Sequence, residues 1–501
     1  MSNLAANLTS TAAASPQAPA LRLGDVIVTF AELQEQAARV AAVLDSRGVG
    51  VGDRVAMMLP NVLAFPAIFY GILRAGAIAV PLNPLLKSGE VEYMLRDSGA
   101  GLLFGWEAMG QDASAGAAAA AADVILIGDA GLAPVIEGVT QAGAPVDRAD
   151  DDTAVILFTS GTTGHPKGAE LTHHGLDSNQ SLTVRTLINL TADDVVMGCL
   201  PLFHIFGLTT GLNAAIGAGA CLTMLPRFDP RAALDILAGH NVTVFEGVPT
   251  MYSAMLAAAG DDEISIPDLR ICVSGGSALP VRVLEEFEER FGCIILEGYG
   301  LSETSPVASF NHPDRDRKPG SIGTPVEGVE MRLVDDERRP VAEGEPGEIQ
   351  IRGANVMKGY WGRPDATALA IDADGWFSTG DIATRDEEGY YRIVDRKKDL
   401  ILRGGYNVYP REVEEVLHQH PSVAEAAVVG VPHDSLGEEV AAAVALKPGK
   451  EATPEELTEF VRDRIAAYKY PRHVWIVDAL PKSATGKILR REVRATTHAE
   501  S

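Results

Sequence analysis

Phe158-Thr-Ser-Gly-Thr-Thr-Gly-His-Pro-Lys-Gly168 is the most informative stretch of this chain. It places three glycines, four hydroxyl side chains and one lysine directly after the apolar run Ala154–Phe158. Glycines let a backbone approach a ligand closely. Hydroxyls and free amides donate to phosphate oxygens, and a lysine adds a positive charge. The stretch therefore predicts a loop that binds a polyphosphate.

The loop differs from the commonest phosphate-binding pattern, in which Gly-Lys-Ser/Thr leads into a helix. Pro166 precedes Lys167 and biases His165 away from helical angles, so we expect no helix to start there. A solvated turn between two strands is the alternative, but such a turn rarely needs so many hydroxyls beside a lysine.

Bulk composition narrows the class of protein. A chain of 501 residues can form two or more cores. Its net charge of −26 argues against nucleic acid and anionic membranes as partners. Four dispersed cysteines without a C-x-x-C pair indicate reduced thiols, and no secretory signal opens the chain, so we expect a cytoplasmic protein. The uncharged residues 207–225 predict a buried helix and strand rather than a membrane span.

Helix and strand signals alternate in the first part of the chain. Thr29-Phe-Ala-Glu32 is a capping box that opens a helix. Such alternation predicts a largely parallel sheet covered on both faces. The alanine-rich residues 112–123 are expected to be a dispensable surface segment. The other elements predicted here are a strand over 54–59, a helix through Ile68 and Leu73, and a strand over 77–81.

A second, smaller domain of α+β type is predicted after the basic segment Tyr391–Arg403. We place the domains at residues 1–397 and 398–501. The elements expected in the second are a helix over 412–420, strands over 423–431 and 440–446, a helix capped at Thr453, and a strand over 474–477 before a basic tail.

Five more segments accompany the glycine-rich loop. They are Gly298-Tyr-Gly-Leu-Ser-Glu303-Thr, Ser378-Thr-Gly-Asp381, Val394-Asp-Arg396-Lys-Lys398-Asp, Arg403-Gly-Gly-Tyr406 and Pro481-Lys-Ser-Ala-Thr-Gly-Lys487-Ile-Leu. In order and spacing the six resemble the motifs of the adenylate-forming superfamily of acyl-CoA synthetases, adenylation domains and luciferases. The resemblance covers residues 20–495.

That resemblance implies a fold and a reaction. The fold is α/β, with a large N-terminal domain of stacked mixed and parallel sheets, flanking helices, and a small mobile C-terminal domain hinged near Lys398. The reaction uses ATP and a carboxylic acid to form an acyl-adenylate and pyrophosphate, after which coenzyme A takes the acyl group. Mg²⁺ accompanies the ATP. A homodimer is compatible with the sequence.

The resemblance also implies roles for individual residues. Lys487 would bridge the α-phosphate and the carboxylate, His204 would gate the acyl tunnel, and Lys167 would hold phosphate. Glu303 would hold Mg²⁺, and Asp381 with Arg396 would bind the ribose. The further residues implied in binding ATP or coenzyme A are Thr159, Ser160, Gly161, Thr162, Thr163, Gly164, Gly276, Ser277, Glu297, Gly298, Tyr299, Gly300, Ser302, Gly404, Gly405 and Tyr406.

Structural interpretations compete with several of these roles. Glu303 and Asp381 could belong to solvated turns. His204 could be a packed core histidine, and Lys487 or Arg403 could be surface charges.

The identity of the acid is constrained less tightly. The Phe203–Gly207 loop holds no carboxylate for a substrate ammonium, which disfavours amino acids. Gly298 stands where related enzymes of malonate type carry a basic residue, which disfavours a dicarboxylate. A medium- or long-chain fatty acid is predicted from a set of apolar or small wall residues, Phe206, Gly207, Thr210, Val248, Met251 and Gly276.

Three alternatives stay open at this stage. They are an aryl acid of cinnamate type, an acyl-AMP ligase that loads a carrier protein, and a catalytically silent relative. The last would be expected to lack Lys167, Glu303 or Lys487, and all three are present.

Overall fold

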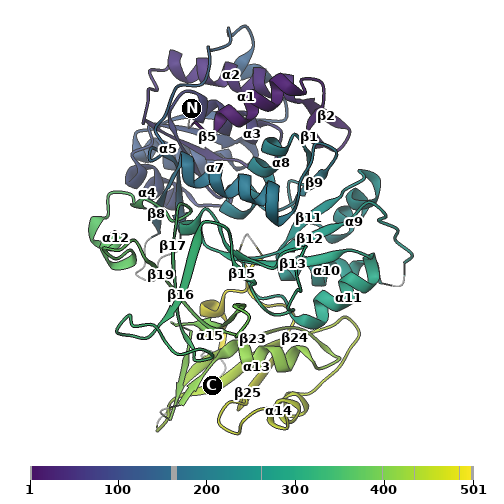
Figure 1. Cartoon of the computed structure of the whole chain (residues 1–501). Helices are drawn as coiled ribbons and strands as arrows, with labels where there is room; N and C mark the ends of the chain where they lie inside the picture. Colours follow the sequence, from purple (N-terminus) through teal and green to yellow (C-terminus); the bar gives the residue numbers. More distant parts are fainter. Residues whose placement is uncertain are drawn as a thin grey trace.

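The computed structural model describes residues 3–159, 166–260, 262–397, 399–404, 406–433, 435–483 and 486–497. Ser160 to Gly164, Lys398 and Gly405, which the sequence implicates in phosphate binding, the hinge and coenzyme A binding, lie outside the described residues. The N-terminus is in the upper part of Figure 1 and the C-terminus in the lower part.

A seven-stranded sheet forms the first layer. Strands β4, β3, β5 and β6 are parallel to one another and to β7, whereas β8 is antiparallel to β7 and β18. In spatial order the strands are β18 (Gly359–Tyr360), β8 (Lys167–Thr172), β7 (Thr153–Thr159), β4 (Ile78–Pro81), β3 (Arg54–Met58), β5 (Leu102–Trp106) and β6 (Asp123–Ile127). The predicted parallel sheet is thus confirmed, with an antiparallel edge.

A nine-stranded sheet forms the second layer. Its central strands are parallel and its ends are antiparallel. In spatial order they are β15 (Thr324–Pro325), β14 (Val307–Phe310), β13 (Ile294–Gly300), β12 (Ile271–Ser274), β11 (Val244–Gly247), β9 (Val195–Gly198), β10 (Cys221–Met224), β1 (Pro19–Leu23) and β2 (Val26–Thr29).

Helices between the two sheets form the largest core. Alternate residues of both sheets, such as Val55 and Val244, pack against them, because successive side chains of a strand point to opposite faces. These segments are α1 (Ala5–Ala14), α2 (Phe30–Ser46), α3 (Ala64–Arg74), α6 (Ala133–Ile136), α7 (His173–Leu182), η2 (Thr183–Leu187), η3 (Gly207–Asn213) and α8 (Ala214–Ala218).

Two further layers of helices cover the outer faces of the sheets, at the left and right of Figure 1. Alternate sheet residues such as Ala56 and Phe245 pack beneath them. The outer helices are α4 (Ser88–Ser98) and α5 (Gly110–Ala120) on the seven-stranded sheet, and α9 (Pro230–Gly239), α10 (Pro249–Ala259) and α11 (Val281–Phe291) on the nine-stranded sheet.

The capping box predicted at Thr29 is present. The Thr29 hydroxyl accepts from the Glu32 amide at 3.3 Å, and a Glu32 carboxylate oxygen accepts from the Thr29 amide at 2.8 Å. Each bond satisfies a backbone donor that the first turn of α2 would leave without a partner. The apolar residues Leu33, Ala37, Val40 and Leu44 are all buried on this helix, as the pattern predicts.

The expectation for residues 112–123 was wrong. Most of this segment belongs to α5, which packs on α4 and buries Ala113, Gly116 and Ala117. A Cβ on Gly116 would come within 2.6 Å of the Val91 Cβ atom. Small residues are therefore required here because two helices approach closely, and low sequence complexity did not mean a dispensable surface.

A four-stranded antiparallel sheet leads toward the smaller C-terminal part. It consists of β16 (Val329–Val334), β17 (Gly347–Gly353), β19 (Phe377–Arg385) and β20 (Tyr391–Arg396). The short helices η1 (Glu107–Met109), η4 (Ser302–Thr304) and α12 (Pro364–Ala370) complete the large domain.

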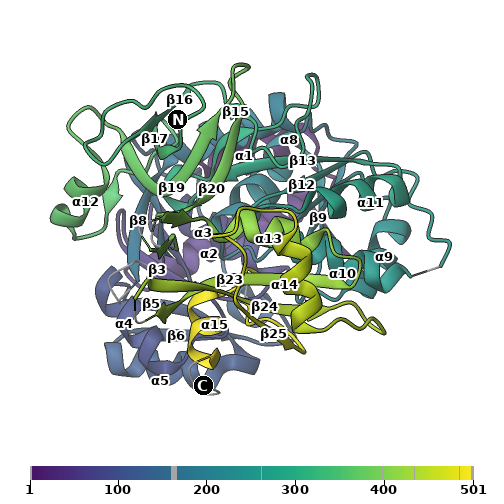
Figure 2. The ribbon, with the colours of Figure 1, turned by 90° about the horizontal axis from the view of Figure 1, so that it is seen from below.

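The C-terminal part has its own sheet and core, with buried residues drawn from Ile401 to Val474. In Figure 2 it lies across the front of the large domain. The position of the boundary near residue 398 stays a prediction. Its elements are β21 (Ile401–Arg403), β22 (Tyr406–Val408), α13 (Pro410–His418), β23 (Val423–His433), β24 (Gly437–Leu446), α14 (Pro454–Arg462), β25 (His473–Val477) and α15 (Arg490–Thr497).

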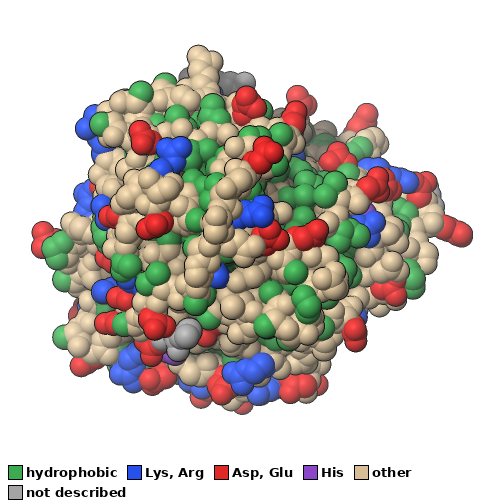
Figure 3. Space-filling model, turned by 90° about the horizontal axis from the view of Figure 1, so that it is seen from above, with side chains coloured by type: hydrophobic (Ala, Val, Ile, Leu, Met, Phe, Trp, Pro, Cys, Tyr) green, Lys and Arg blue, Asp and Glu red, His purple; other side chains and the backbone are tan. Residues whose placement is uncertain are grey.

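Surface and cysteine features agree with the sequence. On the face shown in Figure 3, basic side chains are interspersed with acidic ones and form no continuous basic surface. Cys199, Cys272 and Cys293 are buried free thiols, and Cys221 is a half-buried one. The predicted helix and strand within residues 207–225 are η3 with α8, followed by β10. No helix among the described residues combines the length and apolarity that a membrane crossing requires.

Candidate active site

The glycine-rich loop joins two antiparallel strands. Thr159 ends β7, Lys167 begins β8, and the two residues pair across the hairpin. No helix begins at Lys167, as Pro166 predicts. Only the two ends of the loop are therefore placed by the structure.

The two ends of the loop lie beside Glu303 of η4 and Tyr360 of β18. The Thr159 hydroxyl and the Tyr360 hydroxyl each donate to Glu303 Oε1 at 3.1 Å. Lys167 Nζ lies 5.2 Å from the centroid of the Tyr360 ring, a cation–π distance. The structure thus brings Thr159 and Lys167 of one motif to Glu303 of another, and Tyr360 is an added member that the sequence did not single out.

The donor set around Glu303 suits a hard cation that is held mainly by substrate. The Glu303 carboxylate is buried, and no group of three potential metal-ligating side chains occurs among the described residues. Mg²⁺ is commonly bound through one or two carboxylates plus substrate phosphates rather than by an all-protein cage. One carboxylate beside a phosphate loop fits that mode.

Asp381 sits at the centre of a second polar cluster. The Tyr299 hydroxyl donates to Asp381 Oδ2 at 2.6 Å, and Arg396 Nε lies 3.1 Å from Asp381 Oδ1. Asp381 and Arg396 are paired across β19 and β20, which explains why residues 15 positions apart meet. The Asp381 charge raises the pKa of Arg396. The carboxylate is thus buried between a hydroxyl and a guanidinium group, and it is oriented to accept hydroxyl groups.

Glu297 fixes two backbone segments near the Glu303 and Asp381 clusters, those at Leu279 and Gly320. Its carboxyl oxygens accept from the amides of Gly320 at 2.9 Å and Leu279 at 3.3 Å. Burial raises the pKa of Glu297 to about 7. Through Leu279 it holds the end of the loop that carries Gly276 and Ser277, both of which are exposed.

Two glycines of β13 are required because neighbouring atoms approach them closely. A Cβ on Gly298 would lie 2.6 Å from the Phe310 ring, and one on Gly300 would lie 1.8 Å from the Pro306 carbonyl oxygen. Ser302 follows at the start of η4. These positions shape the wall, and a side chain at Gly298 would first have to displace Phe310.

Lys487 reaches the large domain on a short hairpin. Lys482 and Ile488 form an antiparallel bridge, and the Thr250 hydroxyl donates to the Gly486 carbonyl at 3.1 Å. Burial and the nearby Lys487 charge lower the pKa of His204 to about 4. The structure therefore brings Lys487 close enough to His204 for its charge to act on the imidazole, although the two residues are far apart in the sequence.

Gly404 and Tyr406 contact their own domain instead. The Gly404 amide donates to the Leu436 carbonyl at 2.8 Å, and Tyr406 stacks on Tyr468 with ring centroids 4.8 Å apart. Arg403 forms an ion pair with Glu439. This ion pair agrees with a structural role for Arg403.

Glu246 is a candidate site residue that the sequence analysis did not identify, although its position in an apolar segment was a signal. It is the sole acid in the apolar run Val242–Val248 and ends up 1% exposed on β11. Its Oε2 atom accepts from the Thr210 hydroxyl at 3.1 Å, and its Oε1 atom has no hydrogen-bond partner among the described residues. A carboxyl group buried in this way is a candidate for ligand recognition.

Titration of Glu246 should make the folded protein less stable as pH rises. Burial raises the pKa of Glu246 from 4.5 to about 8, so the folded chain binds a proton there that the unfolded chain has lost. The stabilisation from this proton is complete below the pKa of Glu246 in the unfolded chain. It declines as pH rises to the pKa of Glu246 in the folded chain. From about pH 6 to about pH 7.5 this group should remove about 2 kcal/mol from the free energy of unfolding. In urea unfolding, the free energy of unfolding of Glu246→Gln should fall over the same pH interval by less than that of the wild type, and the difference should equal this amount. Equal declines in both proteins would contradict this reading.

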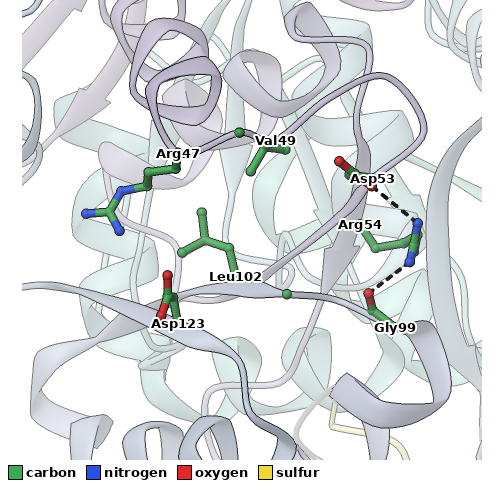
Figure 4. Close-up of a pocket in the computed structure, with 9 residues that line it drawn as sticks. Arg47, Val49, Asp53, Arg54, Gly99, Leu102 and Asp123 are labelled. Carbon is green, nitrogen blue, oxygen red and sulfur yellow. Dashed lines mark hydrogen bonds and ion pairs between the residues drawn. The ribbon is translucent and has the colours of Figure 1, made fainter.

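A small pocket lies at the other end of the parallel strands. Figure 4 shows Arg47, Asp53, Arg54 and Leu102 around it, with Arg54 bonded to the Gly99 carbonyl. Its volume is about 260 Å³. Arg54 and Leu102 begin β3 and β5, whereas ligands of open α/β sheets bind at the carboxyl ends of the strands. The pocket is therefore distinct from the candidate site.

Comparison with known proteins agrees with this arrangement. A model of the AMP-binding enzyme family matches residues 8–361, and a model of the AMP-binding enzyme C-terminal domain matches residues 412–487. A long-chain-fatty-acid–CoA ligase of Bacillus subtilis is 38% identical over 97% of this chain and 93% of its own length. A feruloyl-CoA synthase of an Amycolatopsis species is 38% identical over 96% of each chain.

The same likeness extends to three dimensions. The crystal structure of ATP-bound MatB from Rhodopseudomonas palustris superposes with a TM-score of 0.93 at 34% identity, covering 99% of this chain and 98% of that one. The match spans both domains of this chain.

Proposed function

This chain belongs to the family of AMP-binding enzymes and is an ATP-dependent acyl-CoA ligase, and we propose that its acid is a medium- or long-chain fatty acid. The observation that carries the proposal is the wall around His204. The Phe206 ring fills the space beside Gly275, where a Cβ would come within 2.9 Å of it. Val248 lies against Gly276 in the same way, at 3.5 Å. These contacts favour a narrow, mainly apolar path for an acyl chain.

In the first half-reaction, the acid's carboxylate attacks the α-phosphorus of ATP and pyrophosphate leaves. Lys487 would stabilise the negative charge that gathers between the two groups, because a positioned cation in a partly dry site is more effective than one in water. Thr159 and Lys167 would hold the outer phosphates, and Asp381 with Arg396 the ribose. Mg²⁺ held by Glu303 and the phosphates would neutralise phosphate charge.

The second half-reaction needs a different arrangement of the small domain. Lys487 is at the large domain here, while Gly404 and Tyr406 are engaged with Leu436 and Tyr468. We place the domains at residues 1–397 and 398–501, with rotation about Lys398 exchanging the lysine hairpin for the Gly404–Tyr406 turn. Glycine at this turn would admit the narrow pantetheine arm of coenzyme A.

An aryl acid of cinnamate type is the second candidate. Two observations favour it: a feruloyl-CoA synthase matches 96% of this chain, and the carboxyl group of Glu246 interrupts the otherwise apolar wall. We also propose a cytoplasmic location, which the four free thiols favour.

A panel of acids tests the proposal. CoA-dependent AMP production should be highest for saturated acids of intermediate or long chain and low for acetate, amino acids and dicarboxylates. Purified protein is assayed with ATP, Mg²⁺, coenzyme A and each acid at a fixed concentration. A preference for cinnamates over every alkanoate would replace the fatty acid by the aryl acid. Absence of AMP production with every acid would refute ligase activity itself.

A further inference from the structure

A cluster of buried polar groups lies where the acyl wall was expected to be apolar. Glu246 Oε1, Thr209 Oγ1 and Asn213 Nδ2 are all buried and have no hydrogen-bond partner among the described residues. Glu246 and Thr210 are joined by the 3.1 Å hydrogen bond, and Tyr70 donates to Asn213 Oδ1 at 2.8 Å. Thr209 and Asn213 share η3 with Thr210, and unsatisfied atoms of this kind are unusual, because most buried polar atoms find a partner.

Nothing in the surrounding packing explains the Glu246 carboxyl group. Its neighbours on the same face of the nine-stranded sheet are apolar, including Val244, Val273 and Leu296. None of the described ion pairs includes Glu246. Burying a polar group without a partner costs about 1–3 kcal/mol, so an apolar side chain at this position would stabilise the fold.

The cluster lies along the acyl wall, away from the reacting end. Val248 marks the reacting end, because its Cγ2 atom is 3.1 Å from the Cβ position of Gly486, the residue before Lys487. Glu246 lies on β11 two residues before Val248, which directly follows the strand, and its side chain is on the face of the sheet that borders the largest core. On the helical side, Thr210 follows His204 by six residues and lies within η3.

The two elements meet at Thr210 and Glu246. The Thr210 hydroxyl also lies 2.8 Å from the Phe206 carbonyl oxygen, so its one hydrogen is shared between two acceptors, and a Cβ on Gly211 would lie 3.2 Å from Glu246 Oε2. An acyl group whose carboxylate lies by Lys487 and whose body passes Phe206 would therefore continue toward Thr210 and Glu246.

We propose that Glu246 and Thr210 bind a hydroxyl group that the acid carries at the end remote from its carboxylate, so that the enzyme selects hydroxylated acids. This inference rests on the proposed ligase function and refines its substrate. The group is either the phenol of a hydroxylated aryl acid or the terminal hydroxyl of an alkyl chain, because both present the same donor and acceptor.

The chemistry of the pair suits a neutral hydroxyl. A protonated carboxyl can donate one hydrogen bond and accept others, and a hydroxyl can do both. Burial, which raises the pKa of Glu246, keeps it in this protonated form near neutral pH. A terminal methyl group would leave Oε1 without a partner, and a second carboxylate would bring an unpaired charge into an apolar site.

Matched pairs of acids test the inference. The readout is the ratio of kcat/KM for the hydroxylated acid to that for its parent, measured for 4-hydroxycinnamate with cinnamate and for 10-hydroxydecanoate with decanoate. The wild type should favour the hydroxylated member of at least one pair by about tenfold or more. The pair that shows the preference identifies the ring or the chain as the source of the hydroxyl.

Substitutions then assign the preference to Glu246. Glu246→Leu should bring the ratio to about one or below, whereas Glu246→Gln, which keeps a donor and an acceptor, should retain part of it. If the leucine variant does not fold, Thr210→Val removes the second hydroxyl with little change of shape and should also lower the ratio. Glu170→Leu is the matched control, since its carboxylate accepts from Thr153 Oγ1 at 2.9 Å in the other sheet. It should leave the ratio unchanged.

The outcomes separate this inference from the ligase assignment. A wild-type ratio near one in both pairs, or a ratio that Glu246→Leu leaves unchanged, would overturn hydroxyl recognition while the parent acids still turn over. Loss of CoA-dependent AMP production with every acid would instead refute the ligase function.

Discussion

Replacing Lys487 with alanine is expected to reduce acyl-adenylate formation by about a hundredfold to a thousandfold. The ammonium group is the cation that the small domain brings to the His204 side of the site, and its charge lowers the pKa of His204. Loss of such a preorganised charge acts on the transition state more than on substrate binding. Pyrophosphate release measured with saturating ATP and acid is the direct assay.

The second half-reaction distinguishes this role from general damage. Thioester formation from supplied acyl-adenylate and coenzyme A should change little in Lys487→Ala, because that step is assigned to the Gly404–Tyr406 turn. Lys482→Ala is the matched control on the same hairpin, since Lys482 forms an ion pair with Glu425 at 2.7 Å within the small domain. Equal loss of both half-reactions in Lys487→Ala would show that the division of labour is wrong.

Replacing Arg490 with alanine should also impair adenylate formation, by up to about a hundredfold. Arg490 follows Lys487 by three residues and bonds three acids at once: Asp395 at 2.9 Å, Asp399 at 3.4 Å and Glu414 at 2.6 Å. Removing one partner of a buried charge group costs about 3–5 kcal/mol, and the lower end applies because Arg490 is partly exposed. The arginine is thus a positioning residue that holds the lysine hairpin on the segment next to Arg396.

Two variants test whether Arg490 acts through position. Arg490→Lys keeps the charge but not the planar fork, so it should recover part of the adenylation rate. Arg491→Ala removes an exposed neighbour whose ion pair within the described part of the chain is a 4.0 Å contact with Glu492, and it should behave like the wild type. Thioester formation from acyl-adenylate should fall less than adenylation in Arg490→Ala. Equal losses in the two half-reactions, with no recovery by lysine, would leave Arg490 a purely structural role.

The local elements of the fold were predicted well where a residue's own neighbours in sequence decide its conformation. The Thr29 capping box opens α2, Pro166 prevents a helix at Lys167, and the Thr453 cap starts α14. In each case the side chain or ring acts on backbone groups within about one turn. The alanine-rich α5 was misjudged because its small residues are required by contact with α4, which is not visible from their neighbours in the sequence.

In the candidate site, too, some features were predictable from the sequence and others were not. Motif order was enough to select Lys167, Glu303, Asp381, Arg396 and Lys487, since each motif combines residue types that suit phosphate, cation or ribose. The contacts between residues of different motifs could not be predicted from the order of the motifs along the sequence. That Thr159 and Tyr360 share one oxygen of Glu303 is a property of how β7, β18 and η4 converge.

The sequence by itself determined the class of chemistry, because glycines, hydroxyls, carboxylates and lysines carry their donor and acceptor properties wherever the chain places them. Only the tertiary structure decided which of them act together: that the Lys487 charge acts on His204, that Arg490 fastens its hairpin to Asp395, and that Glu246 meets Thr210. The physical reason is that burial and distance, which set both the pKa of a group and its hydrogen-bond partners, arise when strands remote in sequence pack side by side.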